Sequence, residues 1–99
     1  MNNKLSSLQI EFNDNNILSS LFGIADQNIH LLEKLNNVSI NYRGNIVKII
    51  GQKVAVNETK ITLEKLFNDA KRGIEIDEEK IKDTRSILSF ESKGEAQPD

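Results

Sequence analysis

The feature that most constrains the fold is the way the spacing of apolar residues changes along the chain. Apolar and polar residues alternate over residues 8–12, which is the period of a half-buried strand. Residues 17–35 instead show helical spacing, in two blocks separated by Gly23. Alternation returns over residues 38–50, and helical spacing returns over residues 53–71. The sequence therefore predicts the order strand, helix, helix, strand, strand, helix.

Cap and turn residues mark the predicted boundaries of these elements. Asp26 is a typical N-cap for the second helix. Residues 43–45, Arg-Gly-Asn, predict a tight turn that joins two strands as an antiparallel hairpin. Gly73 is expected to end the long helix, and Asp77 is placed to cap a further one.

These elements predict an α+β fold with a three-stranded sheet, helices on one face and an extra C-terminal helix. We expect the main domain to span residues 8–73 and the additional helix to span residues 74–90. The polar segment 91–99, ESKGEAQPD, contains the only proline and is interpreted as a linker.

The residue types present exclude several kinds of chemistry. The 99 residues include no cysteine, which rules out disulfides and thiolate metal ligands, and the only histidine is His30. No segment has the apolar run of a signal peptide or of a membrane span. We therefore expect a soluble, cytoplasmic protein that binds no metal and no membrane.

Charge is distributed unevenly along the chain, although the net charge is only -2. Residues 36–73 hold seven Lys or Arg and three Asp or Glu, a net charge of +4, whereas residues 1–35 carry -2 and residues 74–99 carry -4. A basic middle between acidic flanks indicates either a phosphate-binding face or a mixed, solvated surface.

The predicted order, with a glycine loop between the first two helices, resembles a type I KH domain. In a KH domain a G-x-x-G loop stands there, and the loop backbone and the start of the next helix hold nucleic-acid phosphates. More specifically, the chain resembles the N-terminal region of PhoH-like ATPases. The resemblance is carried by EFNDNNILSSLFGIADQNIHLLEKL (residues 11–35), VSINYRGNIVKIIG (residues 38–51) and DAKRGIEID (residues 69–77).

The resemblance implies that a P-loop ATPase domain follows this region in the full-length protein. ATP and magnesium are then expected for that domain, and no cofactor for this chain. Members of the family are linked to RNA metabolism, and some to ribosome maturation alongside an endoribonuclease. The implied partners are RNA or a ribonucleoprotein, the protein's own ATPase domain and an endoribonuclease, with oligomer formation left open.

Two departures from the family pattern affect the expected activity. The chain has no G-x-x-x-x-G-K-[ST] motif, so we expect no enzymatic activity from it. The candidate loop is Gly-Ile-Ala-Asp, with Asp26 where a KH loop has its second glycine. A carboxylate at this place repels phosphate and lowers the expected affinity for RNA.

The candidate RNA-binding residues combine this loop with three basic side chains that could reach phosphates or an acidic partner. A structural role is the alternative for each: Gly23 as a helix C-cap, and the basic residues as a solvated surface. Tyr42, the only tyrosine, either stacks on a base or is an aromatic residue of the core or its rim. The candidate residues are Gly23, Ile24, Ala25, Asp26, Arg43, Lys48 and Lys53.

Two other classes of function stay open at this point. The chain could be an assembly or partner-docking module that binds no nucleic acid, which Asp26 and the negative net charge favour. An independent enzyme ranks last, because the sequence shows no nucleophile–base pair and no metal cluster.

Overall fold

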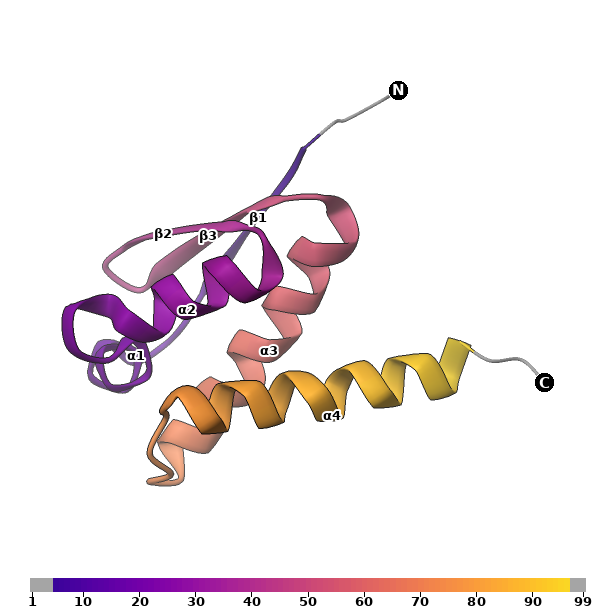
Figure 1. Cartoon of the computed structure of the whole chain (residues 1–99). Coiled ribbons are helices and arrows are strands. Elements are labelled where there is room, and N and C mark those ends of the chain that lie inside the picture. Colours follow the sequence, from indigo (N-terminus) through magenta and orange to yellow (C-terminus); the bar gives the residue numbers. More distant parts are fainter. Residues whose placement is uncertain (1–4, 97–99) are drawn as a thin grey trace.

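The computed structural model describes the backbone of residues 5–96 and the side chains of residues 5–88. A three-stranded antiparallel sheet is covered on one face by helices (Figure 1). This confirms the predicted α+β class and the predicted order of strands and helices. The elements are β1 (Ser6–Glu11), α1 (Asn15–Phe22), a one-turn 3₁₀ helix η1 (Ile24–Asp26), α2 (Gln27–Asn36), β2 (Ser39–Arg43), β3 (Ile46–Gly51), α3 (Lys53–Lys71) and α4 (Glu78–Ala96).

The sheet has the strand order β1-β3-β2, and both outer strands run antiparallel to β3. Its register pairs Ile10 with Val47 and Ile40 with Ile49. These four side chains are buried beneath the helices. Because side chains alternate along a strand, the residues between them lie on the opposite face of the sheet. The hairpin between β2 and β3 turns as predicted, with a positive φ of 60° at Gly44.

The helices close one apolar core against the covered face of the sheet. Leu21 of α1, Leu32 of α2 and Leu63 of α3 are fully buried, and the rings of Phe12 and Phe67 lie 4.6 Å apart. Burying one side chain of this size contributes about 1.5–3 kcal/mol. Among the described residues, none of the helices is both long and apolar enough to cross a bilayer. The face of α3 predicted to be inside is buried at Val56, Thr59, Leu63, Leu66 and Phe67, and half-buried at Ala70.

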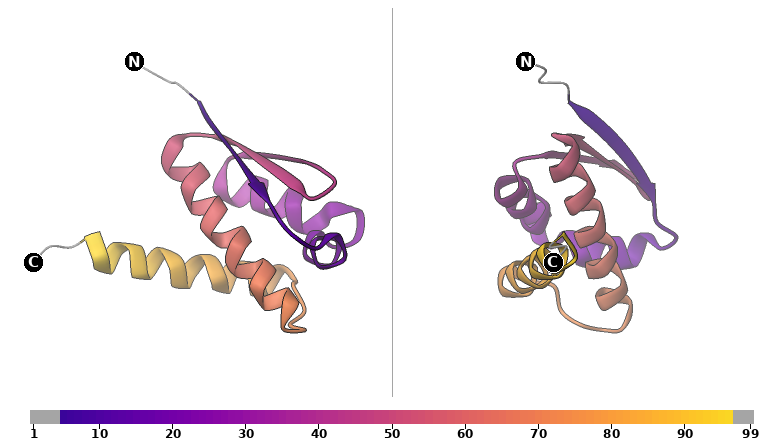
Figure 2. Two further views of the ribbon diagram at one scale, coloured as in Figure 1. Left: turned by 180° about the vertical axis from the view of Figure 1, so that it is seen from behind. Right: turned by 90° about the vertical axis from the view of Figure 1, so that its right-hand side faces the viewer.

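Helix α4 begins at its predicted cap, within the predicted segment 74–90, and extends beyond the predicted end of that segment. It begins at Glu78, and the backbone N–H of Lys80 donates to Asp77 Oδ1 at 2.9 Å, which is the cap expected from the sequence. It ends at Ala96, so it includes six residues that we interpreted as linker, while residues 97–99 lie outside the described residues. Glu, Lys and Ala favour a helix, and the helix-breaking proline comes only at position 98, so the local sequence permits this extension. Figure 2 shows α4 crossing α3 and running on past it.

A buried carboxylate, Asp69, joins α3 to α4. It is 2% exposed, and Lys80 Nζ of α4 lies 3.0 Å from its Oδ2. Lys65 and Arg72 approach Oδ1 at 3.6 and 3.5 Å. Burial raises the pKa of Asp69. The hydrogen bond and charge of Lys80, together with the charges of Lys65 and Arg72, lower the pKa by more, so the net pKa of Asp69 lies below the ordinary range. The carboxylate is therefore ionised at neutral pH and holds the first turn of α4 against α3.

We expect Asp69→Asn to lower the free energy of unfolding by about 1–2 kcal/mol at pH 7, because Lys80 loses its buried counter-charge. A lowered folded-state pKa contributes stability above the ordinary pKa of an aspartate, and this contribution is lost as the pH falls through the folded-state pKa. The difference between wild type and Asp69→Asn should therefore shrink below about pH 4. Urea unfolding followed by circular dichroism at several pH values measures this difference in the free energy of unfolding. Lys65→Met is the control, because Lys65 is an exposed partner of the same carboxylate. A difference that does not depend on pH would contradict the charge as its cause.

Candidate functional site

The loop between α1 and α2 has an unusual backbone. Gly23 adopts φ 81° and ψ 179°, a combination that is almost restricted to glycine. Ala25 and Asp26 follow with φ 53° and 57°, so two consecutive non-glycine residues are left-handed. Such conformations cost on the order of 1–2 kcal/mol each and persist only where the surroundings enforce them.

A buried side-chain amide beside position 23 requires a glycine there. The Asn28 side chain is 3% exposed, and its Nδ2 donates to the carbonyl of Leu21 at 2.8 Å and of Ile76 at 3.0 Å. A Cβ at Gly23 would lie 2.9 Å from this Nδ2. The Gly23 N–H also donates to the Ser19 carbonyl at 3.2 Å, which ends α1. Gly23 therefore has the structural role of a helix C-cap.

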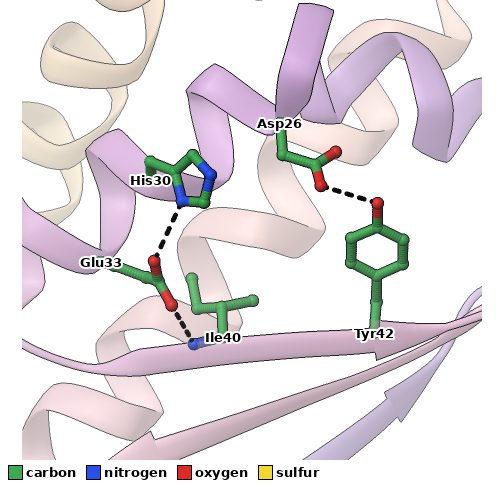
Figure 3. A network of polar contacts seen from close by, with 5 residues as sticks. All are labelled: Asp26, His30, Glu33, Ile40 and Tyr42. Atoms are coloured by element: carbon green, nitrogen blue, oxygen red, sulfur yellow. Dashed lines mark hydrogen bonds and ion pairs between the residues drawn. The ribbon is translucent and has the colours of Figure 1, made fainter.

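Asp26 occupies the predicted N-cap position of α2, but its side chain does not cap the helix. Its backbone is left-handed, and its side chain makes no capping hydrogen bond. Instead, its Oδ2 accepts a hydrogen bond of 2.7 Å from the hydroxyl of Tyr42 on β2 (Figure 3). The ring of Tyr42 is held over the end of α1 by Phe22, with 4.4 Å between the ring centroids. The start of α2 consequently has no side-chain cap.

Tyr42 lies at the rim of the fold and not inside it. It is 43% exposed, which agrees with the rim alternative considered from the sequence. The hydrogen bond to Asp26 raises the pKa of Tyr42, with smaller contributions from burial and from the negative charge of Asp26. Because the chain has one tyrosine and no tryptophan, its tyrosine absorbance and fluorescence come from Tyr42 alone.

Glu33 is a residue of this site that the sequence analysis did not select. Its Oε2 accepts the backbone N–H of Ile40 at 2.8 Å, and its Oε1 lies 3.3 Å from Nδ1 of the exposed His30 (Figure 3). The Ile40 N–H therefore points to α2 and not to β3, so a carboxylate occupies part of the free edge of β2. No sequence signal marks this role, since a glutamate in a helix is ordinarily solvated.

The structure does not bring the three predicted basic residues to the loop. Arg43 follows Tyr42 in β2 and so lies on the opposite face of the sheet. Lys48 lies in the middle of β3 on that same uncovered face. Lys53 is the first residue of α3, just beyond the end of β3 that pairs with Ser6, away from the hairpin end where Tyr42 stands.

A groove lies on the other side of the loop, between it and the link from α3 to α4. Its volume is about 580 Å³. Ile24, which is 83% exposed, and Ile74, which is 37% exposed, both line it. Within the described residues, no group of three or more His, Asp or Glu is arranged to hold a metal ion. The loop between α1 and α2 therefore exposes its backbone and the apolar side chain of Ile24 to solvent.

Comparisons with models of protein families, with curated proteins and with solved structures find no match for this chain.

Gly23→Ala should lower the free energy of unfolding by about 3 kcal/mol or more, because it forces a Cβ into a glycine-only conformation and displaces the Asn28 amide. Gly44→Ala is the matched control. Gly44 also has a positive φ, but nothing lies within 4 Å of its added Cβ, so a loss of about 1 kcal/mol is expected. Chemical denaturation of both variants measures this, and equal losses would contradict the crowding by Asn28.

Asp26→Ala should lower the pKa of Tyr42 toward its ordinary value, because the variant removes both the acceptor and the charge. The measurement is a titration of phenolate absorbance on the folded protein. Glu33→Gln is the control, since it removes a nearby carboxylate that does not contact Tyr42. An unchanged titration in Asp26→Ala would show that the hydrogen bond does not form in solution.

Proposed function

We propose that this chain is a KH-like domain that binds single-stranded RNA, and that it serves as the N-terminal accessory domain of a PhoH-like ATPase. The observation that carries the proposal is the position of the Gly-Ile-Ala-Asp loop. It joins α1 to α2, next to the edge strand β2, in a fold with the order strand, helix, helix, strand, strand, helix. This is the arrangement expected of a domain that holds a nucleic-acid backbone on a loop and bases beside it.

The start of α2 supports a phosphate contact. Because Asp26 turns toward Tyr42, the first N–H groups of α2 have no side-chain cap, and the first turn contains no acidic residue. The Gln27 N–H is bonded to the Ile24 carbonyl, and the positive end of the helix dipole favours an anion at the start of α2. Ile24, exposed at the tip of the loop, offers an apolar contact to a base or a sugar.

The edge of β2 supports a contact with bases. The N–H of Ile40 points away from β3, so the backbone of Tyr42, two residues on, faces the same way. The Ile40 N–H is taken up by Glu33, so the backbone groups left for a base are those of Tyr42, whose ring can stack on an unpaired base. The nearby carboxylates of Asp26 and Glu33 oppose phosphate binding, and the predicted basic residues lie elsewhere. The affinity should therefore be weak.

A second candidate function is docking of a partner protein, such as the ATPase domain of the same protein or an endoribonuclease. The groove between Ile24 and Ile74 favours it, because both apolar side chains are exposed at its lining. Such a partner would contact the loop from the side away from β2. Crosslinking of the full-length protein, with and without Ile24→Asp, tests this candidate.

The RNA proposal predicts that a single-stranded oligonucleotide quenches the fluorescence of Tyr42 at low salt. Asp26→Asn, which removes a charge but keeps an acceptor, should tighten binding about three- to tenfold, because about 1 kcal/mol of repulsion disappears. Asp26→Gly should do the same, since glycine fits the left-handed backbone. Glu58→Gln on the exposed surface of α3 is the matched charge control and should change affinity little.

Arg43→Ala tests whether the uncovered face of the sheet takes part. If Arg43 contacts one phosphate, the variant should weaken binding and reduce the salt dependence by about one counterion. Absence of binding by wild type and by both Asp26 variants at low salt would exclude the RNA function and leave the docking function.

A further inference from the structure

The two outer strands of the sheet differ in how their free edges are protected. On β2, the outward N–H of Ile40 is already bonded to Glu33, and α2 lies alongside. Because the backbone groups of Ile40 point away from β3, those of its partner Ile49 point toward β1. The backbone groups of Leu8, which lies opposite Ile49, therefore point toward β3. The backbone groups of Ser7, Gln9 and Glu11 therefore point outward along the edge of β1.

This edge of β1 is open within the described part of the chain. β1 is the last strand on its side of the sheet, and Figure 2 shows no element beyond it. Proteins usually blunt such an edge with lysine, proline, a bulge or a covering segment. The strand Ser6–Glu11 contains neither lysine nor proline, and its pairing with β3 is continuous. Its unpaired backbone groups can accept a further strand.

A groove beside the same edge can take the side chains of an added strand. It has a volume of about 390 Å³ and lies between the second half of β1 and α3. Ile10 and Phe12 line it on the β1 side, and Phe67 lines it on the α3 side. These three side chains are at most 9% exposed, and the rest of the lining is polar, with Glu11, Asn13, Glu64, Asn68 and Lys71. The groove therefore leaves room for alternate side chains of an added strand, and the backbone hydrogen bonds of the ladder hold that strand.

We propose that the occupant is the β1 strand of a second copy of this chain, paired antiparallel about a two-fold axis at Gln9. This register lets Ser7, Gln9 and Glu11 pair with Glu11, Gln9 and Ser7 of the second copy, and each pair exchanges two backbone hydrogen bonds. Leu8 of the second copy then lies opposite Ile10, at the groove.

The charge on the strand permits this self-pairing. Glu11 is its only charged residue, and in this register it faces the Ser7 of the second copy. The two Glu11 residues are offset by four positions, or about 13 Å along the ladder, which exceeds the Debye length at physiological salt. A register centred on Leu8 would pair only Ser7 with Gln9 within the strand bounds, and so makes fewer hydrogen bonds.

The dimer is a six-stranded sheet with the order β2-β3-β1-β1-β3-β2. Both β2 edges, both α1–α2 loops and the proposed RNA sites lie at its outer ends and stay accessible. The inference is therefore independent of the proposed function, and each can fail without the other.

The test compares two lysine variants that are matched by the sheet register. Gln9 and Asn41 both lie opposite Lys48 on the uncovered face, so Gln9→Lys and Asn41→Lys add the same charge beside the same residue. Only Gln9→Lys places like charges across the two-fold axis. Sedimentation velocity of the full chain, from about 10 µM to about 1 mM to cover weak interfaces, should show wild type passing from one chain to two. Gln9→Lys should raise the dissociation constant at least about tenfold, and Asn41→Lys less than about twofold.

A crosslink then checks the register. The chain has no native cysteine, so Gln9→Cys should form a disulfide with itself across the axis, where hydrogen-bonded residues have Cα atoms about 5.5 Å apart. Ser7→Cys and Asn41→Cys should not. A mass of one chain throughout the range, an equal response of the two lysine variants, or crosslinking at Asn41→Cys in preference to Gln9→Cys would overturn the proposal. A monomer whose β1 edge instead pairs with a strand of another protein would also overturn it.

Discussion

The side-chain amide of Asn28 is the contact on which the arrangement of the helices depends most. Its single Nδ2 donates to the last turn of α1 through Leu21 and to the link before α4 through Ile76. Both carbonyls would otherwise be left without these partners in the interior, at a cost of about 1–3 kcal/mol each. Because the amide must stand directly beside the end of α1, position 23 has no room for a side chain. One buried polar group thus dictates the glycine, the end of α1 and the path of the chain into α4.

Helix α4 is tied to the rest of the fold by charge as well as by this link. Arg85 Nε donates to Asn36 Oδ1 at 2.6 Å, and its Nη2 donates to the Leu35 carbonyl at 3.2 Å, where α2 ends and a cation is favoured. Asn36 Nδ2 in turn donates to Thr59 Oγ1 of α3 at 2.8 Å. Together with the Lys80–Asp69 pair, these contacts make the first half of α4 part of the same core.

The features that the sequence predicts correctly are those set by residues close together in the chain. The bounds of α3, the hairpin turn at Gly44 and the cap by Asp77 follow from residues within one helical turn or one strand of each other. The contacts that it misses join residues far apart in the sequence. Asp26 meets a tyrosine 16 positions away, and one partner of Asn28 is 48 positions away. An aspartate before a helix usually accepts a hydrogen bond from the first N–H groups of that helix. Here the carboxylate of Asp26 accepts from the Tyr42 hydroxyl instead, and the spacing of residues in the sequence does not indicate this partner.

The same long-range contacts explain why the candidate site has its form. The left-handed backbone at Ala25 and Asp26 costs more than one exposed hydrogen bond to Tyr42 can return, since such a bond contributes only about 1 kcal/mol. The balance comes from the buried residues on either side of the loop, Phe22 at 5% exposure and Ile29 at 2%. The core therefore holds the loop in a conformation that it would not adopt alone, and in that conformation the Asp26 carboxylate is turned away from the N–H groups that start α2. The start of α2 has no side-chain cap, and the backbone of the loop before it is already fixed in the free protein. The proposed phosphate contact therefore carries little further cost in conformational entropy.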